Sequence, residues 1–294
     1  MLKVGAACHK PAVFCLMNGR SGTRFLASLL ANNVADAKSL HEPYFDVGND
    51  PMFGRAIFAR AMGETELLRQ RLSRKASHVS NQRAEVYIET SHSFLKSWSH
   101  LQPEFFPNSR FVHLVRDPIA TARSEANREL ALDQLRVPFF RHLATDGRRY
   151  FRWSLTGSEQ IFNPFTSMRL TLFQRYLIQG IEIANRAMQF LDDTEAHDRC
   201  TVLYTPRDLN DPICVSALID ALNLPRSRSK IILKGWRNRT PGFRTRLGPA
   251  EEAQQPAVFE RIDPNFLRVF ERAPYATAPW CERFGSDGFV SADL

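Results

Sequence analysis

Short apolar runs and longer amphipathic segments alternate along the chain. Four apolar runs, rich in β-branched or aromatic residues, predict strands near residues 12–17, 85–89, 111–115 and 200–204. The longest amphipathic segment, from about Met168 to Leu191, repeats large apolar residues at helical spacing, which predicts a helix with a core-facing stripe. This alternation indicates an α/β fold in which a mainly parallel central sheet is flanked by helices.

The first of these strands turns through two glycines into a helical segment. Gly19 and Gly22 can adopt positive φ and let a ligand approach the backbone closely. The first N–H groups of a helix have no partner within it, and with the helix dipole they favour phosphate or sulfate. Hydroxyl and cationic side chains of the same loop can add charge-assisted contacts: Arg20, Ser21, Thr23 and Arg24. The segment therefore predicts an anion-binding loop.

This loop is not a Walker A sequence. Thr23 follows Gly22 directly, where a Walker A loop has lysine, and the early cation is Arg20. An ordinary kinase or NTPase is therefore disfavoured. Any strand–turn–helix unit also needs glycine and a capping residue, so a purely structural loop is the alternative at this point.

A second predicted strand ends in a cation. The apolar run before Arg116 predicts the strand, Asp117 can cap the next helix, and Pro118 suits the first position of that helix, near 118–130. Ligands of open α/β sheets lie at the carboxyl ends of the strands, so we expect Arg116 and the glycine loop to face one crevice. Ser124 could join them from the helix.

The glycine loop, paired with Arg116-Asp117-Pro118 and Ser124 at this spacing, resembles the sulfotransferases that use 3′-phosphoadenosine 5′-phosphosulfate (PAPS). Arg20, where many members carry lysine, resembles the carbohydrate sulfotransferases. The resemblance implies a P-loop-like sulfotransferase fold with PAPS as donor and PAP as product. It also implies a 5′-phosphosulfate site at Arg20, Ser21, Gly22 and Thr23, and a 3′-phosphate site at Arg116 and Ser124.

Arg24 departs from the small hydroxyl residue common at its position in that family. Its guanidinium could bind sulfate, contact the substrate or pair with a local carboxylate. Further along the chain, residues 201–212 resemble the late strand, turn and helix of the family, with Pro206-Arg207 in place of an acidic turn. Lys234-Gly235-Trp236-Arg237 then resembles the basic stretch that closes over the 3′-phosphate and adenine, which implies cofactor contacts by Lys234, Gly235 and Trp236.

Sulfuryl transfer needs a base that removes the proton of the acceptor hydroxyl. The resemblance supports Glu42, because the carbohydrate sulfotransferases use a glutamate of a Glu-Pro segment at this place. For that task we expect burial to raise the carboxyl pKa to about 6–7. The rival is His92, which follows a strand where cytosolic sulfotransferases carry a catalytic histidine, and whose ordinary pKa is about 6.5. Either residue could instead be structural, and Arg20 with the amides of 21–23 would stabilise the transition state.

Composition agrees with this interpretation. The chain has 294 residues, of which 44% are hydrophobic, so we expect a substantial core and a single sulfotransferase domain over residues 1–294. Its five cysteines are scattered and lack metal-ligand spacing, which favours reduced thiols, and the expected chemistry demands no metal. No apolar run is long enough for a signal peptide or a membrane span, so the expected location is the cytoplasm.

Two segments stand out by charge and aromatic content. The formal net charge is +8, and residues 226–246 carry eight cations and no carboxylate. Such a loop could close over the cofactor, bind an anionic glycan or nucleic acid, or simply be solvated. An insertion at about 132–167 mixes aromatic residues with arginines, and it could be an acceptor lid, a secondary core or a dimer surface.

These observations predict a PAPS-dependent sulfotransferase acting on a hydroxyl, of a carbohydrate or glycolipid rather than a small phenol. Two other classes remain as alternatives. An atypical P-loop nucleotide kinase would bind ATP and magnesium tightly. A non-catalytic basic module would bind nucleic acid or glycan in a strongly salt-dependent way.

Overall fold

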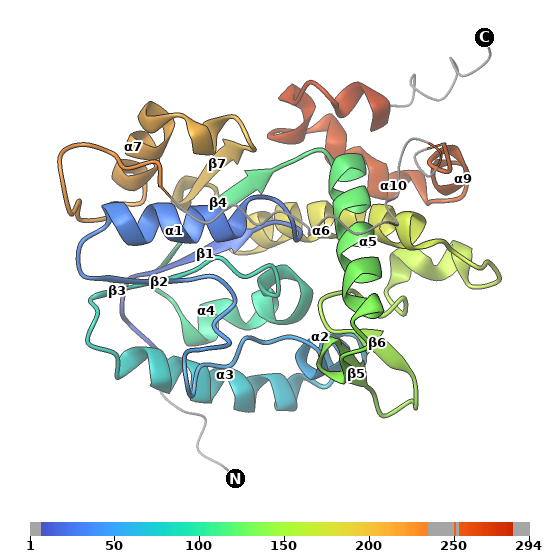
Figure 1. The fold of residues 1–294 in the computed structure, drawn as a ribbon, viewed down its shortest axis with the longest axis horizontal. Coiled ribbons are helices and arrows are strands. Elements are labelled where there is room, and N and C mark those ends of the chain that lie inside the picture. Colours follow the sequence, from blue (N-terminus) through green and yellow to red (C-terminus); the bar gives the residue numbers. More distant parts are fainter. Residues whose placement is uncertain (1–6, 235–249, 251–252, 285–294) are drawn as a thin grey trace.

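The computed structural model describes residues 7–234, 250 and 253–284 (Figure 1). Within these residues the centre is a five-stranded parallel sheet of order β2-β3-β1-β4-β7. Its strands are β1 (Ala12–Leu16), β2 (Ala37–Leu40), β3 (Val86–Glu89), β4 (Ser109–Val115) and β7 (Cys200–Tyr204). The four runs predicted as strands are present, and the predicted α/β class is confirmed. The sequence alone does not predict β2, because its four residues are only partly buried and form no apolar run.

The side chains of β1 alternate between two hydrophobic clusters, one on each face of the sheet. Ala12, Phe14 and Leu16 belong to the larger cluster, whereas Val13 and Cys15 belong to the smaller one. This alternation follows from the two-residue period of a strand. Because both faces are covered, the strand reads as a continuous apolar run, as expected for a buried parallel sheet.

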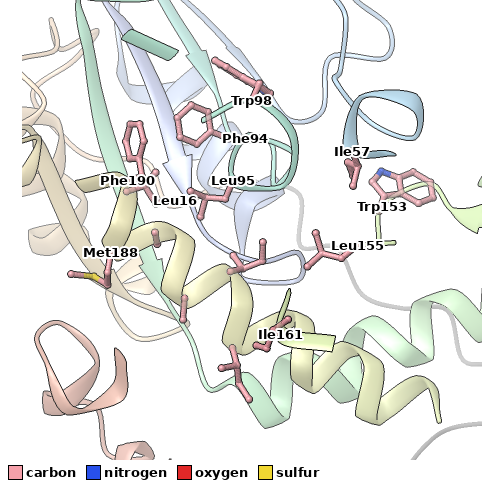
Figure 2. Close-up of a cluster of buried hydrophobic side chains, with 14 of the residues drawn as sticks. Leu16, Ile57, Phe94, Leu95, Trp98, Trp153, Leu155, Ile161, Met188 and Phe190 are labelled. Atoms are coloured by element: carbon pink, nitrogen blue, oxygen red, sulfur yellow. The ribbon is translucent and has the colours of Figure 1, made fainter. Parts of the chain in front are cut away.

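Different helices close the two clusters. The smaller cluster is covered by α1 (Thr23–Asn33) and α7 (Pro212–Ala221). The larger cluster is covered by α2 (Arg55–Ala61), α3 (Thr65–Ser80), α4 (Gln102–Phe105), α5 (Pro118–Gln134), α6 (Leu172–Asp193), α9 (Pro256–Phe259) and α10 (Pro264–Leu267). A π-helical turn, Phe94–Trp98, fills its centre, where Phe94 lies 5.2 Å from Phe190 between ring centroids (Figure 2).

Capping residues set the starts of the two long helices. The Asp117 carboxylate accepts a hydrogen bond of 2.9 Å from the Ile119 amide, and α5 begins at Pro118 as predicted. Thr171 and Gln174 form a capping box, so α6 begins at Leu172, and the predicted start near Met168 is too early. The two helices pack against each other.

The chain leaves β1 and β4 towards opposite faces of the sheet. These strands are neighbours, and α1 follows β1 into the smaller cluster. In contrast, α5 follows β4 into the larger cluster, where it buries Ile119, Ala122 and Ala126. Such a reversal between adjacent parallel strands opens a crevice at their carboxyl ends.

The segment at 132–167 contributes to the larger cluster. It contains a short antiparallel pair, β5 (Arg141–Leu143) and β6 (Arg149–Phe151). Its aromatic side chains Phe151, Trp153 and Phe162 are buried in that cluster, whereas Phe139 is half-exposed. Most of these aromatic residues are therefore part of the main core and do not form a secondary core of their own.

Three properties of the described residues bear on the chemistry that the chain can support. None of their helices combines the length and apolar character needed to cross a membrane. All five cysteines lie among these residues as free thiols. The described His, Cys, Asp and Glu side chains do not gather in groups of three or more that could hold a metal ion.

Candidate active site

A cavity of about 780 Å³ lies at the carboxyl edge of the central sheet. Residues that follow each of the five strands of the central sheet line it: the glycine loop after β1, Glu42 after β2, His92 after β3, Arg116 after β4 and Thr205 after β7. This volume lies within the range of small-molecule sites. The structure therefore brings the predicted glycine loop, Arg116, Ser124 and both candidate bases into one cavity.

The two glycines of the loop serve different purposes. Gly22 caps α1 with a φ of 94°, a left-handed conformation that favours glycine, as predicted. Gly19 does not have positive φ, so that part of the prediction is wrong, and Arg20 takes a φ of 64° instead. A Cβ at Gly19 would lie 2.1 Å from Glu125 Oε1, so this position needs glycine because a buried carboxylate approaches its Cα.

The glycine loop contacts both residues of the second predicted anion site. Arg20 Nε donates a hydrogen bond of 3.0 Å to Ser124 Oγ, and Arg116 Nη1 donates to the Arg20 carbonyl. Burial, together with the charge of Arg128, lowers the pKa of Arg20 to about 10, and burial also lowers the pKa of Arg116. With a pKa of about 10, Arg20 is still a cation at neutral pH.

Arg24 lies one residue into α1, where it lines the same cavity and is exposed. Ser21 and Thr23 are buried on either side of Gly22. The amino end of α1 therefore presents backbone N–H groups, two hydroxyls and an arginine to the cavity, which suits an anion.

Glu42 follows β2 with a φ of 49° and is nearly buried, with 12% of its side chain exposed. His92 Nε2 lies 2.9 Å from Glu42 Oε1, and His41 Nε2 lies 3.6 Å from the same oxygen. Burial alone would raise the pKa of Glu42, but His41, His92 and Arg128 together hold it well below its usual range. The shift is opposite to the one expected from the sequence, because cationic and hydrogen-bonding neighbours outweigh desolvation.

His92 is buried between Glu42 and a lysine. Its Nδ1 lies 3.2 Å from Lys96 Nζ, which also donates a hydrogen bond of 2.7 Å to the Trp153 carbonyl. An ammonium group has only donors, so Nδ1 accepts and Nε2 carries the proton that faces Glu42. Burial, followed by the charge of Lys96, lowers the pKa of His92 to about 4, so the ring is neutral at neutral pH.

Arg128 of α5 and Lys96 of the π-helical turn are two further ionisable groups close to Glu42 and His92. Arg128 Nη2 lies 2.6 Å from Glu125 Oε2, and the guanidinium lies 5.2 Å from the Trp153 ring centroid. Burial lowers the pKa of Lys96 to about 7, whereas Glu125 opposes that shift.

The side chains of Arg128, Glu125 and Lys96, together with that of His41, are absent from the sequence prediction. Helical spacing could have indicated Arg128 and Lys96, which lie four residues after Ser124 and His92 respectively.

Of the predicted basic stretch, the structure describes Lys234 alone. The Lys234 carbonyl accepts a hydrogen bond of 2.7 Å from Asn32 Nδ2, near the end of α1 that lies far from the glycine loop. Lys234 does not line the cavity. Gly235 and Trp236, with most of the basic loop at 226–246, lie outside the described residues.

Comparisons with known proteins give the following similarities. No family model matches the chain, and no curated protein matches it. Among solved structures, it is similar to a sulfotransferase from Alicyclobacillus acidocaldarius, with 15% identity and a TM-score of 0.48 over 89% of this chain and 94% of the other. It is also similar to the sulfotransferase domain of the Synechococcus PCC 7002 olefin synthase, with 16% identity and a TM-score of 0.44 over 74% and 75% of the two chains. A sulfotransferase domain from the curacin biosynthetic pathway matches with 13% identity and a TM-score of 0.39 over 96% and 98%.

Proposed function

We propose that the protein is a sulfotransferase that transfers a sulfuryl group from PAPS to an acceptor hydroxyl and releases PAP. The observation that carries the proposal is the convergence of two anion-binding elements and a carboxylate in one cavity. The glycine loop, the pair of Arg116 and Ser124, and Glu42 come from three different strand ends. Their combination matches the needs of a doubly phosphorylated donor and a hydroxyl acceptor.

In this proposal the donor lies along the amino end of α1. The backbone amides of residues 21–23 and the Arg20 guanidinium bind the 5′-phosphosulfate, and Arg116 and Ser124 bind the 3′-phosphate. Two features support the assignment. Gly22 supplies the left-handed turn that opens the helix towards the cavity, and Arg20 contacts Ser124 directly, so both anion sites can engage one molecule.

Glu42 is the base of the proposed reaction. As a bond forms between the acceptor oxygen and sulfur, the bond from sulfur to the bridging phosphate oxygen breaks, and the acceptor proton passes to the carboxylate. The lowered pKa of Glu42 keeps it ionised at neutral pH, although it also makes the carboxylate a weaker base. His92 acts as a positioning residue, because its Nδ1 lone pair faces Lys96 and its Nε2 proton faces Glu42.

Electrostatic stabilisation comes from the cations around the leaving group. Charge grows on the bridging oxygen of the 5′-phosphate, and the proposal assigns its stabilisation to Arg20 and the loop amides. The resemblance of the motifs favours a hydroxyl of a carbohydrate or glycolipid as acceptor.

The first test is thermal stabilisation by PAP, compared with AMP and with ATP plus magnesium. PAP at about 100 times its dissociation constant should stabilise the fold by about 2.7 kcal/mol. Arg116→Ala and the milder Ser124→Ala should each reduce this effect. Arg110→Ala is the matched control, because Arg110 lies near the opposite end of β4 and donates to the Ala221 carbonyl.

The two alternative classes give different results in the same assay. Preferential stabilisation by ATP with magnesium would indicate a nucleotide kinase. Stabilisation by an anionic glycan or nucleic acid that survives Arg116→Ala and Glu42→Ala, but weakens steeply with salt, would indicate a basic binding module. If no nucleotide stabilises the protein, the sulfotransferase proposal fails.

A further inference from the structure

One face of α5 runs along the cavity from its polar end to its mouth. The lining residues of this helix and its carboxyl-terminal cap are Ser124, Arg128, Ala131, Leu132 and the capping residue Leu135. Their spacing places them on a single helical face. The face extends over about 16 Å, and its last part, beyond Arg128, is apolar over about 10 Å.

Side chains from two other segments complete this apolar part of the cavity. Tyr44 and Phe45 follow Glu42 and Pro43 along the chain, and Trp153 lies beneath the Arg128 guanidinium. The rings of Tyr44 and Trp153 lie 6.3 Å apart between centroids. We call the space bounded by these side chains the apolar arm: Tyr44, Phe45, Ala131, Leu132, Leu135 and Trp153.

The apolar arm is uncovered at its outer end. Phe45 is 99% exposed and Leu135 is 52% exposed, although both are large apolar side chains. Exposed apolar side chains at the mouth of a cavity are typical of a ligand-binding surface. An apolar ligand that lies against them would remove this surface from water.

The arm is poorly suited to a bare sugar. Among its described residues, the side-chain polar groups are the Tyr44 hydroxyl and the Trp153 indole nitrogen. A sugar has several hydroxyls, each of which needs a hydrogen-bond partner when it leaves water. An alkyl chain has no such need, and its burial is favourable in proportion to its apolar area.

We propose that the acceptor of this site is an alcohol whose hydroxyl is carried on an extended apolar chain that lies in the apolar arm. This inference rests on the proposed sulfotransferase function. It places the hydroxyl at Glu42 and the chain along Leu132 and Leu135 towards the mouth. A lipid-like alcohol therefore replaces a bare carbohydrate as the expected acceptor.

The test is sulfation of a homologous series of primary alcohols, from 1-butanol to 1-octanol, with glucose as the polar comparison. With PAPS as donor, kcat/KM should rise with chain length, by up to about fourfold per methylene, while the chain remains within the arm. Glucose, which also has a primary hydroxyl, should be a much poorer acceptor than 1-octanol.

Matched variants locate the effect. Leu135→Ser and Phe45→Ser should lower kcat/KM for 1-octanol by about fivefold or more, and they should lower it by a smaller factor for 1-butanol, whose shorter chain covers less of the arm. Leu143→Ser and Val47→Ser are the controls, because these residues are 62% and 93% exposed and do not line the cavity. All four positions are at least half exposed, so the fold should tolerate the changes.

Stabilisation by PAP separates the two possible failures. If PAP stabilises the protein but kcat/KM does not depend on chain length, or glucose is the better acceptor, the apolar-chain proposal is wrong and the sulfotransferase proposal stands. The same conclusion follows if the control variants lower 1-octanol sulfation as much as Leu135→Ser does. If PAP does not stabilise the protein, the sulfotransferase proposal fails and the acceptor proposal fails with it.

Discussion

His92 lies between two ionisable groups, with Nδ1 3.2 Å from Lys96 Nζ and Nε2 2.9 Å from Glu42 Oε1. Glu42 faces the cavity with part of its side chain exposed, whereas His92 is only 1% exposed. The two candidate bases therefore differ in access, although they form one pair. Access to the acceptor favours Glu42 as the group that takes the proton.

Substitution of the two residues distinguishes their roles. Glu42→Gln should lower kcat by about 10²–10⁴-fold, the usual contribution of a general base. His92→Gln should lower it by less than about tenfold, because the amide can still donate to the carboxylate. The measurement is kcat at saturating PAPS, with stabilisation by PAP as the control for an intact donor site. The reverse order of effects would identify His92 as the base.

Among the elements, α5 connects several parts of the proposed site. Its capping residue Asp117 follows Arg116, its second turn carries Ser124, and its carboxyl-terminal half lines the apolar arm. Asp117 Oδ2 also accepts a hydrogen bond of 2.7 Å from Arg283 Nη2. This bond links the start of the helix to residues 253–284. The position of this one helix therefore affects both the proposed donor site and the proposed acceptor site.

The cap of α5 can be tested by two substitutions of Asp117. Asp117→Ala should lower the free energy of unfolding by about 1 kcal/mol, because the Ile119 amide loses its acceptor. Asp117→Asn should lower it less, because the amide oxygen can still cap the helix and the partly exposed pair with Arg283 contributes little. Chemical denaturation measures both values. Equal losses for the two variants would show that the ion pair, and not the cap, stabilises this end of the helix.

At the scale of the whole molecule, residues 253–284 pack against the central sheet. His113 of β4 is buried and its Nε2 lies 2.9 Å from the hydroxyl of Tyr275. Desolvation by burial lowers the pKa of His113 to about 4. Protonation of this ring therefore opposes the packing of the terminal segment on the sheet.

The burial of His113 makes the free energy of unfolding depend on pH. An unfolded histidine has a pKa of about 6.5, so the unfolded state binds more protons than the folded state between about pH 6.5 and pH 4. His113 should therefore cost the fold on the order of 3 kcal/mol as the pH falls through that window, and nothing above it. His92, with a similar lowered pKa, acts in the same direction.

The test is the free energy of unfolding of the wild type and His113→Leu at pH 7 and pH 4.5. The variant should lose less stability than the wild type over this interval. His9→Gln is the control, because His9 is exposed and should leave the pH dependence unchanged. Identical pH dependence of His113→Leu and the wild type would contradict the prediction.

Much of the fold is local in origin and could be predicted. The apolar runs specify four strands, because burial on both faces requires continuous apolar residues. Asp117-Pro118 specifies the start of α5, and Gly22 specifies a left-handed turn, because these preferences depend on neighbouring backbone atoms. The order of strands and turns then places the glycine loop and Arg116 at one edge of a parallel sheet.

Other features depend on contacts between distant segments. Arg20 and Ser124 are separated by 104 residues, and only the fold shows that they are hydrogen-bonded. The reason for glycine at position 19 is the Glu125 carboxylate, which no local pattern reveals. The edge strand β2 escapes prediction because its pairing with β3, and not an apolar run, makes it a strand.

The sequence by itself determined the α/β class, and it predicted the anion-binding character of the glycine loop and the residues that could act as a base. The tertiary structure decided the direction of the Glu42 pKa shift, because that balance depends on His41, His92 and Arg128, which come from three separate segments. It also decided the apolar nature of the arm beyond Arg128. Local preferences follow from neighbouring residues, whereas desolvation and charge at a site depend on every segment that the fold packs around it.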